Sequence, residues 1–202
     1  MVNARAMEMN SSMYCSKAQL KTILGAEKKY KKAIWHSMQT VMPAVVIAVW
    51  ENSQVRETGL IKWKKALYDV IEECAADDDL TIFQVLEEKT GLEIQIGDGV
   101  SYKDTAFANA KIFDQHMNDL NPMKWIRYYQ KKAQWANVIV MSACMMGLHN
   151  AFRWSAEGNL SKILLKANEI LDWYGTNPKA FRLEYERVTG LKLDDLFKDI
   201  PK

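Results

Sequence analysis

Two long stretches without formal charge constrain the fold more than any other feature of this chain. Ala33–Trp50 spans 18 residues and Ala133–Phe152 spans 20, and both consist mainly of apolar side chains. A helix of this composition is apolar around most of its circumference, so it has to be covered on all sides. We therefore expect each stretch to form a central helix, with the other helices packed around the two.

Both stretches approach the ~20 residues that a helix needs to cross a bilayer. Polar residues interrupt them, including His36 and Gln39 in the first and Asn137 and His149 in the second. The more strictly apolar parts, such as Val41–Trp50, are too short to span. The sequence therefore predicts two buried core helices and no membrane partner.

The two stretches belong to a longer internal similarity. Residues 31–35 and 131–135 share lysines, an alanine and a tryptophan at an offset of 100, and the apolar phase continues beyond them. After a one-residue gap, Glu87-x-x-Thr90-Gly91-Leu92 matches Glu186-x-x-Thr189-Gly190-Leu191. Order, spacing and pattern agree, although few residues are identical. We interpret the similarity as a tandem duplication; the alternative is chance likeness among amphipathic helices.

The predicted fold class is all-α, with about eight helices. The duplicated unit of about 100 residues is expected to pack as a pseudo-twofold helical bundle, because each central helix can cover the other. Residues 1–15 are expected to be a flexible N-terminal segment, 16–97 the first helical repeat and 98–202 the second. Burial between the repeats would make them one cooperative unit.

Several helix ends can be placed from local chemistry. Ser16 can cap a helix that starts at Lys17. Gly91 and Gly190 follow helical patterns and can adopt the left-handed conformation that ends a helix, after which Leu92 and Leu191 fold back on the last turn.

Other boundaries are predicted from breakers and periodicity. Pro43 is expected to kink or break the first central helix, whereas the second, which begins at Asn121-Pro122, is expected to continue to Trp154. Leu92–Ile96 alternates like a short strand or an extended linker. A helix over residues 101–120 is predicted from a capping pattern at Ser101.

The sequence lacks the common motifs for catalysis. It contains no phosphate-binding glycine loop and no nucleophile elbow, and His36, His116 and His149 are isolated. Carboxylates gather at Glu72-Glu73 and Asp77–Asp79, where they are expected to be a solvated capping run. The alternative is a carboxylate/Mg-dependent helical enzyme. We expect no catalytic residue, metal or cofactor.

The most suggestive segments combine lysines with aromatic residues. Cations neutralise phosphates and aromatic rings stack on bases, so these segments are candidates for nucleic-acid binding if they lie side by side. Trp35 and Trp135 are expected to anchor the core instead. The candidate binding residues are Lys28, Lys29, Lys31, Lys32, Arg127, Tyr128, Tyr129, Lys131 and Lys132.

The leading functional hypothesis is a non-catalytic helical interaction protein that binds or inhibits a protein partner. Seven Trp, eight Tyr and eleven Met support it, because such side chains anchor interfaces. The alternative is a nucleic-acid-binding regulator, although a net charge of +2 does not require a polyanionic partner. The absence of a signal-peptide pattern and three separated cysteines predict a cytoplasmic protein with reduced thiols.

Overall fold

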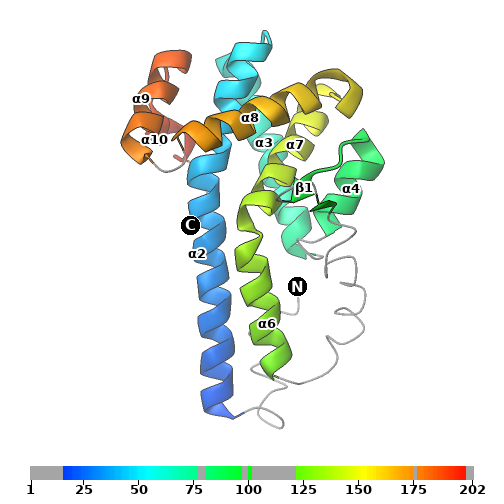
Figure 1. The fold of residues 1–202 in the computed structure, drawn as a ribbon, viewed down its shortest axis with the longest axis vertical. Helices are drawn as coiled ribbons and strands as arrows, with labels where there is room; N and C mark the ends of the chain where they lie inside the picture. The colour runs from blue at the N-terminus through cyan, green and yellow to red at the C-terminus, as the bar shows by residue number, and fades with distance from the viewer. Residues whose placement is uncertain (1–15, 77–80, 97–99, 102–121, 175–176, 199–202) are drawn as a thin grey trace.

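The protein is all-α and is organised around two helical columns that run in the same direction (Figure 1). The computed structural model describes residues 16–76, 81–96, 100–101, 122–174 and 177–198. Within this part of the chain there are eight α-helices, a short π-helical segment and one two-residue antiparallel ladder. The predicted flexible segment 1–15, the carboxylates Asp77–Asp79 and nearly all of the predicted helix 101–120 lie outside the described residues.

The first column is the single helix α2 (Lys17–Asn52). Its start is confirmed as predicted, because the Ser16 hydroxyl accepts from the Gln19 N–H at 3.2 Å and the Gln19 side chain accepts from the Ser16 N–H at 2.9 Å. Of the kink or break predicted at Pro43, the break is wrong, because α2 continues through this residue. Residues 41–49 are all buried, and this packing offsets the one backbone hydrogen bond that proline removes.

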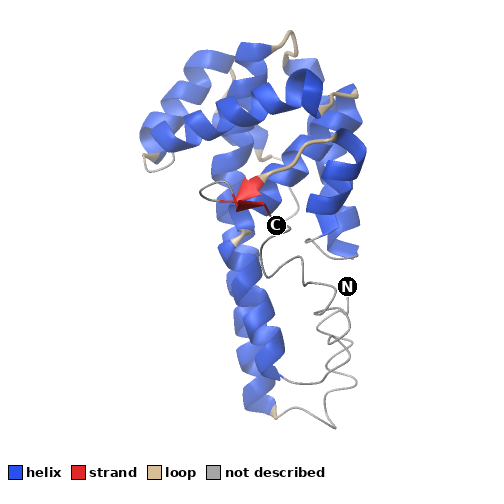
Figure 2. Ribbon diagram, turned by 45° about the vertical axis from the view of Figure 1, so that its right-hand side comes forward, coloured by secondary structure: helices blue, strands red, loops and turns tan. Residues whose placement is uncertain are grey.

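The second column consists of two helices, α6 (Pro122–Gln134) and α7 (Ala136–Phe152). The predicted continuous helix is therefore wrong at Trp135, whose N–H bonds to the Lys132 carbonyl three residues back instead of four. The break separates an amphipathic helix that lies along the lower half of α2 from one that is buried nearly all round (Figure 2).

The helices that follow each column cross over to the other. α3 (Glu57–Ala76) and α4 (Thr81–Thr90) come after α2 but pack on α7, whereas α8 (Ser161–Tyr174) and α9 (Pro178–Thr189) come after α7 but pack on α2. The π-helical segment Ala156–Leu160 leads into α8, and α10 (Leu193–Leu196) packs on α9. The two columns are thereby covered on their outer sides, as their composition requires.

The predicted extended segment is confirmed only in its last two residues. β1 (Gln95–Ile96) pairs antiparallel with β2 (Val100–Ser101), with Gln95 opposite Ser101. Ser101 is the last residue of β2, and the helix that it is predicted to cap lies outside the described residues.

The helix ends at Gly91 and Gly190 are confirmed, and both glycines are left-handed, with φ of 73° and 70°. The glycine N–H bonds to the Glu87 carbonyl in one case and to the Glu186 carbonyl in the other, at 2.8 and 2.9 Å. At each end the preceding threonine hydroxyl accepts from the N–H of the following leucine, at 3.0 and 3.1 Å. Two helices with different sequences thus end with the same set of hydrogen bonds.

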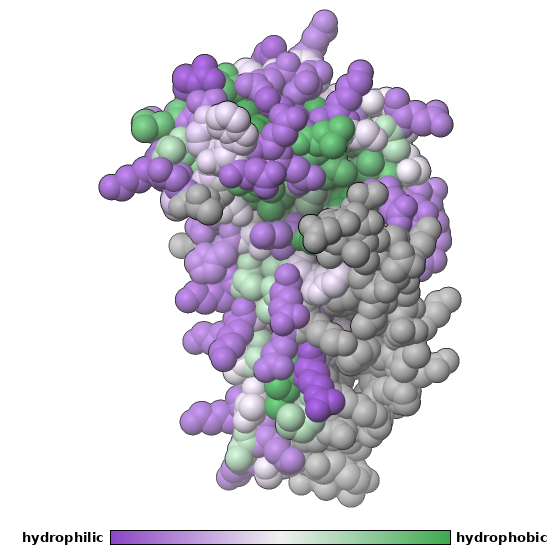
Figure 3. Space-filling view, in the orientation of Figure 1, coloured by the Kyte–Doolittle hydropathy of each residue, from purple (hydrophilic) through white to green (hydrophobic). Residues whose placement is uncertain are grey.

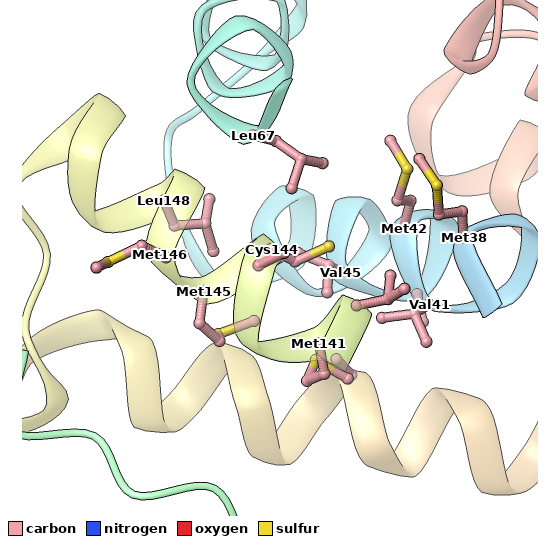
Figure 4. Close-up of a cluster of buried hydrophobic side chains, with 14 of the residues drawn as sticks. Met38, Val41, Met42, Val45, Leu67, Met141, Cys144, Met145, Met146 and Leu148 are labelled. Carbon is pink, nitrogen blue, oxygen red and sulfur yellow. The ribbon is translucent and has the colours of Figure 1, made fainter. Parts of the chain in front are cut away.

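The core lies between α2 and α7, at the level where α3 packs on α7 (Figure 4). Trp63 is fully buried and its indole Nε1–H donates to the Cys144 carbonyl of α7 at 3.1 Å. Gly147 allows this close approach, because a Cβ there would lie 3.1 Å from the Leu67 Cα. The Cys144 side chain lies between Leu67 and α2, and complete burial raises the pKa of its thiol well above the ordinary value.

α2 is the one described helix that is long and apolar enough to cross a membrane. In this fold 61% of its most apolar window is buried against protein. The covered stretch agrees with the core helix that the sequence predicts.

Candidate functional site

The two basic–aromatic segments lie side by side along α2 and α6. The Tyr30 ring of α2 lies 6.1 Å from the Tyr129 ring of α6, measured between centroids, and Tyr128 and Tyr129 meet edge to face at 5.5 Å. In the sequence Tyr30 stands among four lysines. The packing of α2 on α6 half-buries the Tyr30 ring and leaves the four lysines exposed. The juxtaposition needed for a shared basic surface is therefore present.

Lys132 occupies the centre of this contact and is only 6% exposed. Its ammonium lies 4.9 Å from the centroids of both Tyr30 and Tyr128, and donates to the Tyr128 hydroxyl at 3.2 Å. Cation–π attraction is strongest when the charge is removed from water, as it is here. The prediction of Lys132 as a surface cation for a polyanion is wrong, because its charge faces the tyrosines between the helices.

The remaining predicted residues divide into exposed cations and covered rings. Tyr128 is buried, and Tyr30 and Tyr129 are half-buried, so these rings are not open for base stacking. Lys31 also pairs with Glu27 at 2.8 Å. The side chain of Lys131 lies outside the described residues. The exposed cations are Lys28, Lys29, Lys31, Lys32 and Arg127.

Trp35 and Trp135 pack against the core, in agreement with their predicted role as anchors. Both are half-buried, and Trp35 meets Phe197 edge to face at 6.1 Å. Neither ring provides an open stacking platform. As a whole, the lysine–tyrosine cluster joins the two columns, and the cations beside it are the part that solvent or a partner can reach.

A second candidate surface is formed by exposed side chains of α8 and α9 at the other end of the molecule, where Figure 3 shows apolar side chains scattered among hydrophilic ones. Trp173 is 79% exposed, Leu165 66% and Leu183 68%. Sequence reasoning missed these residues, although a signal existed. The buried face of α8 is set by Ile163, Ala167 and Ile170, and both Leu165 and Trp173 lie off that face.

Several charged side chains on and beside this surface form ion pairs with one another or with α2. Arg182 and Asp194 form two hydrogen bonds at 2.7 and 3.0 Å, and the hydrogen bond from Arg182 lowers the pKa of Asp194. Lys166 contacts Glu51 at 3.4 Å, and the charge of Glu51 raises the pKa of that lysine. Part of the charge around the exposed apolar residues is thus neutralised by ion pairs.

Within the described ranges, no three His, Cys, Asp or Glu side chains gather closely enough to hold a metal ion. His149 is half-buried, and its Nδ1 lies 2.8 Å from the Trp154 carbonyl oxygen. Its ring is thus hydrogen-bonded to the backbone of its own chain.

No protein-family model, curated protein or solved structure matches this chain.

Proposed function

We propose that the chain is a non-catalytic helical protein that binds a protein partner through the exposed face of α8 and α9. The observation that carries the proposal is the 79% exposure of Trp173, together with the exposure of Leu165 and Leu183 on the same two helices. Tryptophan is strongly enriched among the residues that dominate binding energy at interfaces. Large apolar side chains that stay exposed on two neighbouring helices favour a protein surface as the partner.

We infer that the chain arose by tandem duplication, which bears on where a partner would bind. The crossed packing supports it, since α3 and α4 relate to α7 as α8 and α9 relate to α2. Burial at equivalent positions agrees closely, as in Leu86 with Tyr185, each 1% exposed, and Thr90 with Thr189, each 6% exposed. We infer that the two halves are pseudo-twofold copies of one ~100-residue unit.

The exposed apolar residues are not shared by the two copies. At the positions equivalent to Leu165 and Leu183, the first copy carries the exposed polar residues Lys65 and Gln84. The apolar pair is therefore not required by the packing of the repeat. It is a property of the second copy alone, as expected for a binding face.

Affinity capture from the native host tests this function. The wild-type chain is expected to retain one stoichiometric protein, and Trp173→Ala should weaken the purified complex by about 30-fold, the equivalent of ~2 kcal/mol for a central interface residue. Leu183→Gln, which restores the residue of the first copy, should weaken it further.

The matched control is Ile61→Ser, which changes an exposed apolar residue of α3 to its equivalent in the second copy, Ser161. It should bind like wild type. Retention of the partner by the combined Trp173→Ala and Leu183→Gln chain, or capture of no protein, would contradict the proposal.

A second candidate function is nucleic-acid binding by the exposed cations of α2 and α6. The observation in its favour is that five cationic side chains lie exposed on two adjoining helices. Phosphate binding would be steeply salt-dependent. Reversing Lys28, Lys29, Lys32 and Arg127 to Glu should abolish RNA binding, whereas Lys179→Glu with Lys192→Glu, at the other end, should not. Equal binding by both variants would eliminate this function.

A further inference from the structure

A groove of about 720 Å³ lies where the two columns end, between the last residues of α2 and α7. The groove is wide open to solvent, so a ligand bound there would stay partly exposed. Its lining combines side-chain amides, two aromatic rings and two cations, and none of its lining residues is acidic. The lining residues include Asn52, Gln54, Lys62, Phe152, Arg153 and Trp154.

Arg153 ends α7 in a backbone conformation that is strained for any residue other than glycine. Its φ is 59°, the left-handed region, and it is the only non-glycine residue of the described chain with positive φ. Gly91 and Gly190 occupy the same position at the ends of α4 and α9. A side chain in this conformation costs about 1 kcal/mol, and such strain concentrates at functional sites. The presence of an arginine at this strained position therefore indicates that its guanidinium has a function.

The segment that carries Arg153 is held from two sides. The Arg153 N–H donates to the His149 carbonyl at 2.7 Å, and the His149 Nδ1 lies 2.8 Å from the Trp154 carbonyl. Phe152 and Trp154 face each other at 5.0 Å with a tilt of 35°, and the Lys62 ammonium lies 5.8 Å from the Phe152 ring. The groove thus has fixed rings with a cation beside them.

The charge balance of the groove favours an anion. The C-termini of α2 and α7 each bring about half a negative charge, and this charge disfavours a bound anion. At the end of α2, Arg56 donates to the carbonyls of Trp50, Ser53 and Val55 at 2.7–3.3 Å and offsets that charge. Arg153 makes no side-chain hydrogen bond or ion pair with any described residue, and Lys62 makes only its ring contact. Two cations are therefore available to a ligand.

We propose that this groove binds a mononucleotide, a ligand that joins a phosphate to a planar heteroaromatic ring. Lys62 and Arg153 contact the phosphate, the ring packs on Phe152 and Trp154, and the amides of Asn52 and Gln54 pair with its edge. This site is separate from the α8–α9 face and does not depend on the protein-binding function.

Calorimetric titration of the full chain with AMP, GMP and UMP tests the site. At least one nucleotide should bind, and Arg153→Gly and Lys62→Gln should each weaken it by about tenfold or more. Arg153→Gly also removes the backbone strain, so its Tm should equal or exceed that of wild type. Lost binding therefore cannot be attributed to lost folding. Lys65→Gln, an exposed lysine of α3 outside the groove, is the matched control and should bind like wild type.

Adenosine and inorganic phosphate, titrated alone, should each bind at least tenfold more weakly than the nucleotide. Equal affinity for phosphate alone overturns the proposal, because the rings would then contribute nothing. Equal affinity for adenosine overturns it too, because the cations would not be used. Absence of binding by all three nucleotides at millimolar concentration, or unchanged binding by Arg153→Gly, also overturns it.

Discussion

Replacing Trp63 by alanine is expected to lower the free energy of unfolding by about 3–5 kcal/mol, as truncation of a buried tryptophan usually does. The side chain is 0% exposed, and its Nε1–H reaches the Cys144 carbonyl at 3.1 Å. The change would leave a cavity where α3 meets α7 and would remove a hydrogen bond between them. For a chain of this size each 1 kcal/mol shifts Tm by roughly 2–4 °C, so we expect a fall of about 6–20 °C.

Urea denaturation followed by circular dichroism measures this change. Trp173→Ala is the matched control, because it removes the same side chain from a position that is 79% exposed, and surface changes stay within about 0.5 kcal/mol. Trp63→Phe retains most of the apolar contact and loses the indole donor, so it should fall between the two. Equal stability of the two alanine variants would contradict the packing of α3 on α7.

The parts of the fold that local chemistry determines could be predicted from the sequence. The cap at Ser16 needs only a hydroxyl and a glutamine three residues later, and the ends at Gly91 and Gly190 need only a residue that tolerates positive φ. Burial of the uncharged stretches follows from their composition. The helix ends depend mainly on a few neighbouring residues, and here the tertiary packing agrees with those local preferences.

The parts that depend on distant contacts could not be predicted. Pro43 is a strong local breaker, yet α2 continues through it because its neighbours are buried from all sides. Trp135 carries no breaker, yet the second column divides there. The crossing of α3 to α7 and of α8 to α2 decides which residues meet, and no local pattern encodes it.

The candidate site shows the same division. Similar Lys-Lys-Ala-x-Trp segments predict similar roles for Lys32 and Lys132, but one is exposed and the other is 6% exposed between two tyrosines. The difference arises because α6 turns its Tyr128–Lys132 face towards α2, whereas α2 presents Tyr30. Periodicity could have shown Trp173 as an outlier on α8, since that needs only the apolar pattern of a single helix.

Reversing the charge of the buried Lys132 is expected to lower the free energy of unfolding by about 3–5 kcal/mol. In Lys132→Glu a carboxylate would replace an ammonium 4.9 Å from the centroids of both Tyr30 and Tyr128. The faces of aromatic rings are negative and repel an anion, and burial would withhold water from it. The hydrogen bond to the Tyr128 hydroxyl, now 3.2 Å long, would also lose its donor.

Lys32→Glu is the matched control, because Lys32 is the equivalent lysine at an offset of 100 and is exposed on α2. It should change the free energy of unfolding by less than about 0.5 kcal/mol. Lys132→Met, which keeps an unbranched apolar stem without the charge, should cost less than Lys132→Glu. The difference between Lys132→Met and wild type, measured by urea denaturation, then reports the total contribution of the ammonium to stability. If Lys32→Glu and Lys132→Glu proved equally stable, the two lysines would be equivalent surface cations and Lys132 would not join α2 to α6.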